Sequence, residues 1–265
     1  MTIEFENRSF SKRLTSMLSV DFKRMFTMPL IYILIGASLV IPILILVMTT
    51  AMPSTTIDPV TGLEKEMETF TNTWQAIATV SGDSQGAMSL VSMCNINMMY
   101  FAVAVLVCIF VGDDFRSGYA KNLFTMRAQK TDYVISKTLV CFVGGAFMFV
   151  AYFIGTTLGG AIAGLPFDLG GAGVSGVIMC LISKICLIAL FVSIFLIASV
   201  FARQKLWLSI ILSLGIGMLF FMVIPIVSPL DSGILQVCLS LFGGAIFSVG
   251  LGAISNLLLN KISLV

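Results

Sequence analysis

The sequence predicts an all-α membrane protein: six transmembrane helices preceded by an amphipathic helix at the membrane surface. Three observations predict it. Hydrophobic residues make up 58% of the chain and charged residues only 11%, a composition that ordinary soluble domains do not have. The apolar residues fall into six stretches of about 20 residues or more, long enough to cross a hydrocarbon core of roughly 30 Å. Nearly all the basic residues flank these stretches on one side.

The six apolar stretches alternate with loops of unequal charge. They are Leu30–Thr50, Met88–Val111, Thr138–Ile162, Val177–Phe201, Trp207–Val227 and Leu235–Leu259. The basic residues on one side are Arg8, Lys12, Arg13, Lys23, Arg24, Arg116, Lys121, Arg127, Lys130, Lys137, Arg203, Lys205 and Lys261. The loops on the other side contain only Lys65. The positive-inside rule therefore places both termini in the cytoplasm, with residues 51–87 outside and the loop 112–137 inside.

Residues 1–29 are expected to form a cytosolic segment, ahead of a transmembrane domain over residues 30–265. Apolar residues between Phe10 and Met28 recur at helical spacing, which predicts an amphipathic helix lying along the inner leaflet. A solvated helix packed on another protein is the alternative. Asp21 is an exception to the pattern, because it projects close to the apolar arc.

Three further features concern the shape of the bundle. Pro42 falls inside the first span and should kink it. In the external loop, residues Thr69–Val80 suit a short helix at the outer interface, with Trp74 at headgroup level. Four glycines with small-xxx-small spacing predict close helix packing, either within the chain or between subunits: Gly155, Gly159, Gly160 and Gly164.

Several classes of chemistry are excluded by what the sequence lacks. Histidine is absent, which removes His-based triads, the HExxH zinc site and His proton relays. The six cysteines form no CxxC pair, so they read as apolar filler rather than a metal or redox site. There is no GxxxxGK[ST] phosphate loop. We therefore expect no enzyme and no cofactor in this chain, and no basic patch suited to nucleic acid.

The loop between the second and third stretches carries the most functional information. It reads GDDFRSGYAKNLFTMRAQKTDYVISK from Gly112 to Lys137. Gly118 can break the helix, and Thr131 with Asp132 can cap the next one. This predicts a helix–turn–helix hairpin with an apolar edge, suited to docking on a soluble protein. A solvated positive-inside loop is the alternative.

This loop resembles the cytosolic loop of ABC-2-type transporter permeases. The resemblance lies in Asp113-Asp114-Phe115-Arg116-Ser117-Gly118, Lys121-Asn122, Arg127 and Ser136-Lys137. Within the family it is similar to small bacterial permeases of bacteriocin and other antimicrobial-peptide export or immunity. The family shares the amphipathic N-terminal helix, the six spans and the cytosolic termini. Asp113 and Asp114 stand where Glu is common in the family.

The resemblance implies a half-transporter in the bacterial cytoplasmic membrane. It would pair with a second permease, identical or paralogous, and with two separate ATPase subunits that bind ATP and Mg²⁺. The region Asp113–Lys130 would be the coupling helix, seated in a groove of the ATPase, and the N-terminal helix would be the connecting helix. Phe115, Tyr119, Leu123 and Phe124 would supply apolar contact. The coupling residues are Asp113, Asp114, Phe115, Arg116, Gly118, Tyr119, Lys121, Asn122, Leu123, Phe124, Arg127 and Lys130.

Polar residues within the spans are candidates for a substrate path. Lys184 is the one charge placed well inside a span, and an intramembrane charge is a functional hypothesis by default. Snorkelling toward the interface is the alternative. Asn95 and Asn97, in the outer half of the second stretch, could line a path or bond neighbouring helices.

We thus expect an ATP-driven exporter subunit that moves a hydrophobic or amphipathic substrate, peptides included. A non-transporting scaffold, or an immunity or sensor protein that binds a toxin or peptide, is the alternative. An intramembrane enzyme is disfavoured, because Ser183 and Lys184 point about 100° apart on a helix and form no ready dyad.

Overall fold

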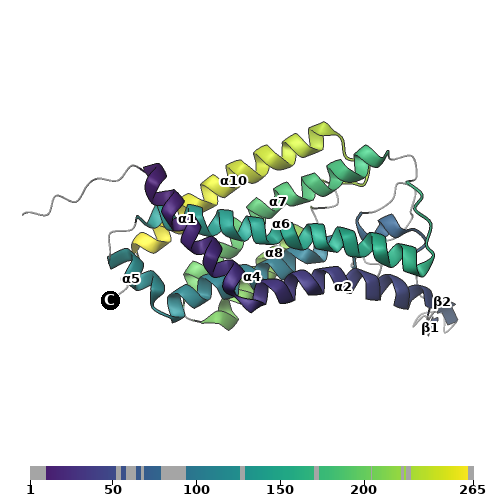
Figure 1. The fold of residues 1–265 in the computed structure, drawn as a ribbon, viewed down its shortest axis with the longest axis horizontal. Helices are drawn as coiled ribbons and strands as arrows, with labels where there is room; N and C mark the ends of the chain where they lie inside the picture. The colour runs from purple at the N-terminus through teal and green to yellow at the C-terminus, as the bar shows by residue number, and fades with distance from the viewer. Residues whose placement is uncertain are drawn as a thin grey trace, which may run out of the picture.

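The fold is a bundle of long helices with a small β-hairpin at one end (Figure 1). The computed structural model describes residues 10–51, 55–57, 64–66, 69–78, 94–125, 129–169, 173–203, 205–221, 224 and 228–261. The helices are α1 (Phe10–Thr27), α2 (Pro29–Ala51), α4 (Met99–Arg116), α5 (Tyr119–Thr125), α6 (Lys130–Ala163), α7 (Val174–Ala202), α8 (Leu206–Phe221) and α10 (Ile234–Lys261). Strands β1 (Thr55–Ile57) and β2 (Glu64–Glu66) pair antiparallel. Helices dominate, as the predicted fold class requires.

Within the described part of the chain, five helices are long and apolar enough to cross a membrane. They are α2, α6, α7, α10 and the segment Ile96–Arg116, which joins a short 3₁₀ turn to α4. Helix α8 is apolar but has 16 residues, and part of the predicted fifth span beyond it lies outside the described residues. The predicted second span is displaced: described helix begins at Ile96 and continues to Arg116, past the expected membrane boundary.

The helices differ in how deeply they lie in the bundle. Of the most apolar 18-residue segment of each helix, 67% of the residues are buried in α4 and in α7, against 22% in α2 and 11% in α10. Helices α4 and α7 therefore form the core, while α2 and α10 turn most of their apolar side chains outward. An apolar outer surface on a membrane-spanning bundle is what contact with lipid requires.

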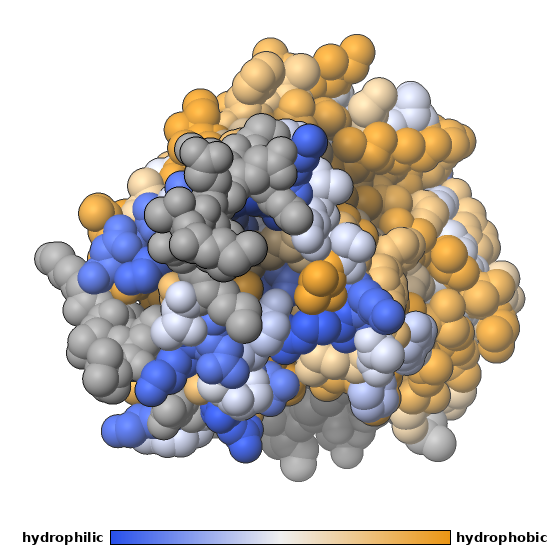
Figure 2. Space-filling view, turned by 60° about the vertical axis from the view of Figure 1, so that its left-hand side comes forward, coloured by the Kyte–Doolittle hydropathy of each residue, from blue (hydrophilic) through white to orange (hydrophobic). Residues whose placement is uncertain are grey.

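The polar elements gather at the two ends. Helices α1 and α5 and the last turn of α10 lie at one end, and the β-hairpin lies at the other (Figure 1). Seen toward the α1 and α5 end, hydrophilic residues cluster there and the flanks are hydrophobic (Figure 2). The structure therefore groups the elements that the charge pattern assigns to one side. That this side is the cytosol rests on the positive-inside rule.

Glycines of α6 bring that helix against α2. A Cβ added at Gly159 would lie 2.8 Å from Ile43 Cα, and one at Gly155 would lie 2.8 Å from Pro42 Cγ and closer still to the Leu39 carbonyl. These contacts lie within one chain, which favours helix packing inside the chain over packing between subunits as the use of these glycines. Gly164 has a different use, because it ends α6 in the left-handed region with φ 69°.

The predicted helix over Thr69–Val80 is wrong. The structure has a 3₁₀ turn, Thr73–Ala76, capped by the Asn72 side chain. It packs on the outer end of α6: the Thr73 amide donates to the Pro166 carbonyl at 3.1 Å, and the Trp74 ring lies 6.1 Å from that of Phe153. Trp74 is thus half-buried in protein. Amphipathic spacing does not distinguish a membrane interface from a protein surface.

Candidate functional site

The described part of the predicted hairpin is a continuation of the core helix α4 at the α1 end of the bundle. Helix α4 runs on to Arg116, and the chain then turns at Gly118, whose φ of 75° favours glycine. The Ser117 hydroxyl donates to the Asp113 carbonyl at 2.7 Å and closes the end of the helix. Helix α5 follows and leads back to α6. Gly118 therefore breaks the helix as predicted.

The predicted cap by Thr131 and Asp132 is wrong. Gln129 is the N-cap of α6 and makes no capping bond with its side chain. The Asp132 carboxylate instead accepts from Arg13 Nε at 3.1 Å, while Arg13 Nη2 donates to Gln129 Oε1 at 3.0 Å. The charge of Asp132 in the first turn is still stabilised by the positive end of the helix dipole. Here it also fastens α1 to the start of α6.

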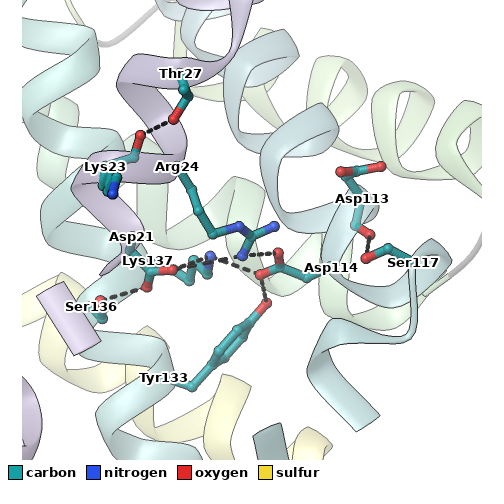
Figure 3. Close-up of polar contacts among 10 residues, drawn as sticks. All are labelled: Asp21, Lys23, Arg24, Thr27, Asp113, Asp114, Ser117, Tyr133, Ser136 and Lys137. Carbon is teal, nitrogen blue, oxygen red and sulfur yellow. Dashed lines mark hydrogen bonds and ion pairs between the residues drawn. The ribbon is translucent and has the colours of Figure 1, made fainter. Parts of the chain in front are cut away.

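Beneath the hairpin lies a charge cluster, which we define as Asp21, Arg24, Asp114 and Lys137 (Figure 3). Lys137 Nζ lies 2.8 Å from Asp21 Oδ1 and 2.8 Å from Asp114 Oδ2. Arg24 Nη1 lies 2.8 Å from Asp114 Oδ1 and 3.9 Å from Asp21 Oδ1. The cluster joins α1, α4 and α6, and its two acids and two bases carry no net charge.

Neighbouring side chains complete the cluster. The Tyr133 hydroxyl donates to Asp114 Oδ2 at 2.9 Å, and the Ser136 hydroxyl donates to Asp21 Oδ2 at 2.6 Å. Aromatic rings cover the two cations: Lys137 Nζ is 4.1 Å from the Phe110 ring centroid, and the Arg24 guanidinium is 4.1 Å from that of Tyr119. Buried charges are tolerated when paired and hydrogen-bonded in this way.

Arg24 stays charged at the edge of this cluster. Burial alone lowers the pKa of Arg24, but the attraction of Asp114 and its hydrogen bond raise it, with smaller contributions from Tyr119 and Asp21. The net result is a pKa above the ordinary arginine value. A guanidinium of this kind is a permanent charge, so proton uptake or release by Arg24 is not how the cluster would be opened.

A further contact ties the last helix to the hairpin. Lys130 Nζ donates to the Leu259 carbonyl at 2.8 Å, in the final turn of α10. Carbonyls there have no partner within the helix, and a lysine satisfies both the hydrogen bond and the dipole. The base of the hairpin is therefore held by α1, α4, α6 and α10.

The structure divides the predicted coupling residues into two groups. The exposed ones are Asp113, Arg116, Lys121 and Asn122. The apolar ones turn inward: Phe115 is buried, Leu123 packs against the core, and the Phe124 ring lies 5.4 Å from that of Tyr133. Phe115 is therefore not part of an outward apolar edge, whereas Leu123 and Phe124 are half-buried and keep part of their surface exposed. Arg127 lies outside the described residues.

Asp114 and Tyr119 are also turned inward, the first as an acid of the charge cluster and the second as a cover for Arg24. The sequence reasoning missed their partners Asp21 and Lys137 as site residues. One signal was present: an acid close to the apolar arc of an amphipathic helix needs a buried cation.

Lys184 and Asn97 are brought together. Lys184 lies on α7, is 0% exposed, and donates from Nζ to Asn97 Oδ1 at 2.7 Å. The side chain is therefore anchored in the bundle instead of snorkelling outward. Asn95 is buried, and its side chain caps the 3₁₀ turn that precedes α4 by accepting from the Asn97 amide at 2.9 Å.

Comparisons with known proteins agree with this architecture. A family model described as ABC-2 family transporter protein matches residues 22–223, which is most of the chain. Searches of curated proteins and of solved structures gave no match. The match covers α2 through α8, including the hairpin and every member of the charge cluster except Asp21. The chain is therefore a member of the ABC-2 transporter family, a multi-pass membrane permease subunit of an ATP-binding-cassette transporter.

Proposed function

We propose that this permease is an exporter subunit that moves a hydrophobic or amphipathic substrate, peptides included, across the bacterial cytoplasmic membrane. Two separate ATPase subunits would bind ATP and Mg²⁺ and supply the energy, and a second permease, identical or paralogous, would complete the pathway. The observation that carries the proposal is the hairpin: a short polar helix, α5, projects from a bundle end that is braced by buried charges.

The exposed side chains of the hairpin would contact the ATPase. Arg116, Lys121 and Asn122 are exposed and offer charge and hydrogen-bond donors, and Asp113 is exposed as well. Charges at the rim of an interface set association rate, orientation and partner choice. The inward aromatic residues would act differently, by holding α5 in position.

The bracing would convert motion of α5 into motion of helices. The short turn at Gly118 joins α5 directly to α4, and the charge cluster locks α4 to α6 and α1. Helix α4 in turn packs on α7 and α8. A push on α5 would therefore move α1, α4 and α6 together, with α2 following α6, and would change how they pack on α7 and α8.

The proposal is tested by reversing one charge on α5. In Lys121→Glu, we expect affinity for the ATPase to fall about tenfold, or about 1.4 kcal/mol, and substrate-stimulated ATP hydrolysis to fall with it. Lys205→Glu is the matched control, because Lys205 is also exposed but lies in the α7–α8 turn. Unchanged binding and hydrolysis in Lys121→Glu would refute the docking surface. Failure of any ATPase to co-purify with the wild-type chain would favour the non-transporting scaffold.

The substrate path is proposed to pass Lys184 and Asn97. The proposal is supported by the buried Lys184 amine in a membrane-spanning helix. Burying a charge there costs free energy, so such residues are candidates for function. Lys184→Met keeps the length of the side chain and removes the charge. We expect it to lower transport while leaving the thermal unfolding midpoint unchanged or higher, and Lys184→Arg to retain transport. Normal transport by Lys184→Met would remove this residue from the path.

A further inference from the structure

A groove of 590 Å³ lies between α6, α7 and α10, and neither α5 nor Lys184 lines it. Its walls include Leu139 and Phe142 of α6 and Val249 and Gly252 of α10, with Cys186 of α7 between them. The lining is almost wholly apolar. Grooves of this size hold ligands of a few tens of atoms.

The open side of the groove faces the lipid. All three helices are of membrane-spanning length, and α10 is the least buried of them. Leu139 is 43% exposed and Val249 is 75% exposed. Apolar side chains exposed at this depth meet acyl chains rather than water. A hydrocarbon chain is therefore the natural occupant.

One end of the groove is polar and lies near a basic residue. Thr131 and Asn256 line it there. Lys130 is outside the lining, but its ammonium donates to the Leu259 carbonyl at 2.8 Å, three residues along α10 from Asn256. The positive end of the α6 dipole points the same way. Asp132 lies in the first turn of α6, but its charge is balanced by Arg13 at 3.1 Å. A group that binds at this end would meet a positive potential at the level of the inner headgroups.

We propose that this groove binds an anionic phospholipid of the cytosolic leaflet. One acyl chain would lie along α6 and α10, and the phosphate would meet the Lys130 ammonium, the Thr131 hydroxyl and the Asn256 amide. Basic pockets between transmembrane helices on the cytoplasmic side are suited to acidic headgroups. A helix of a second copy fits less well, because its apolar side chains would cover Thr131 and Asn256. The inference does not depend on the proposed export function.

The experiment is native mass spectrometry of the purified full chain, offered phosphatidylglycerol or phosphatidylcholine in equal amounts. We expect wild-type protein to retain phosphatidylglycerol about fivefold more, equivalent to about 1 kcal/mol for one basic residue at an anionic headgroup. Lys130→Gln keeps a donor for the Leu259 carbonyl but loses the charge, so it should bind both lipids equally.

A pair of glycine variants tests the acyl chain. A Cβ at Gly252 would meet Val134 Cγ1 at 3.6 Å, an ordinary contact, so Gly252→Leu can fill the groove without disturbing the backbone. It should lose bound lipid. Gly250→Leu, on the same helix with nothing within 4 Å of its Cβ, should retain it. Equal lipid retention by the two variants, or no headgroup preference in the wild type, would overturn the proposal. A dimer broken by Gly252→Leu with lipid unchanged would assign the groove to a second copy instead.

Discussion

Asp114 and Lys137 are each 0% exposed, so each depends on the other and on Asp21 for its electrostatic compensation. Desolvating two ions costs several kcal/mol per ion, and a buried pair often contributes little net stability. Its consequence is specificity: an arrangement of α1, α4 and α6 that separated the charges would leave them buried and unpaired. The cluster therefore fixes how the N-terminal helix docks under the hairpin.

Removing one member of the cluster should cost more than removing a matched pair. We expect Lys137→Gln and Asp21→Asn each to lower stability by about 3–5 kcal/mol, because each leaves an unbalanced buried charge. The neutral double variant should lose clearly less than the sum. Thermal and denaturant unfolding in detergent measure this, with exposed Lys23→Gln as the control. Strictly additive losses would show that the four charges do not act together.

The cluster was only partly predictable from sequence. Asp21 stood out as an acid near an apolar arc, but Lys137 looked like any other positive-inside lysine. The two are separated by 116 positions, and their pairing depends on where α1 crosses the bundle. Lys184 was recognised as an intramembrane charge, yet only the packing of α4 on α7 shows that Asn97 is its partner.

Helices α2 and α6 approach closely because α6 has glycines on the face that meets α2. At Gly155 and Gly159 there is no room for a side chain between the two backbones. Close approach of this kind increases van der Waals contact, which drives helix association where lipid and protein are equally apolar. The packing of α2 on α6 therefore depends on glycine, with no Cβ atom, at these two positions.

Gly155→Ala should destabilise the bundle by about 1–3 kcal/mol, because the added methyl collides with the Leu39 carbonyl and Pro42. Gly243→Ala is the matched control on α10, where nothing lies within 4 Å of the added Cβ, and alanine also has the higher helix propensity. Unfolding midpoints of the two variants decide the matter. An unchanged midpoint for Gly155→Ala would mean that α2 is free to shift away from α6.

At the scale of elements, the sequence predicted which segments are helices better than where they begin and end. The length of an apolar stretch identifies a span, but it does not show where a helix continues past the apolar residues, as α4 does to Arg116. It also cannot say which face of α5 points inward. Gly118 was a local signal, and there the prediction was confirmed.

The whole molecule has two chemically distinct ends. The end with α1 and α5 is hydrophilic (Figure 2), and the β-hairpin marks the opposite end (Figure 1). Membership of the ABC-2 family implies that a cytosolic ATPase supplies the energy, and we propose that it binds at the hydrophilic end.

Cysteine labelling tests the predicted orientation. In a background without the native cysteines, Ser11→Cys on α1 should be protected from an impermeant thiol reagent in intact cells, and Ser175→Cys on α7 should react. Both positions are exposed, and serine to cysteine changes one atom. The expectation follows from the crowding of Lys and Arg at the α1 end. The opposite pattern would invert the topology, and equal labelling would contradict it.

The central claim is that α5 is the element through which an ATPase drives this permease. Site-specific photo-crosslinking in the native membrane tests it most directly. A photoreactive residue at exposed Asn122 should crosslink to a protein that carries the Walker phosphate-binding loop, with a yield that changes when ATP is added. The same probe at Lys205, exposed in the neighbouring turn, should give far less product. Absence of an ATPase adduct at Asn122, or equal yields at the two positions, would contradict the claim.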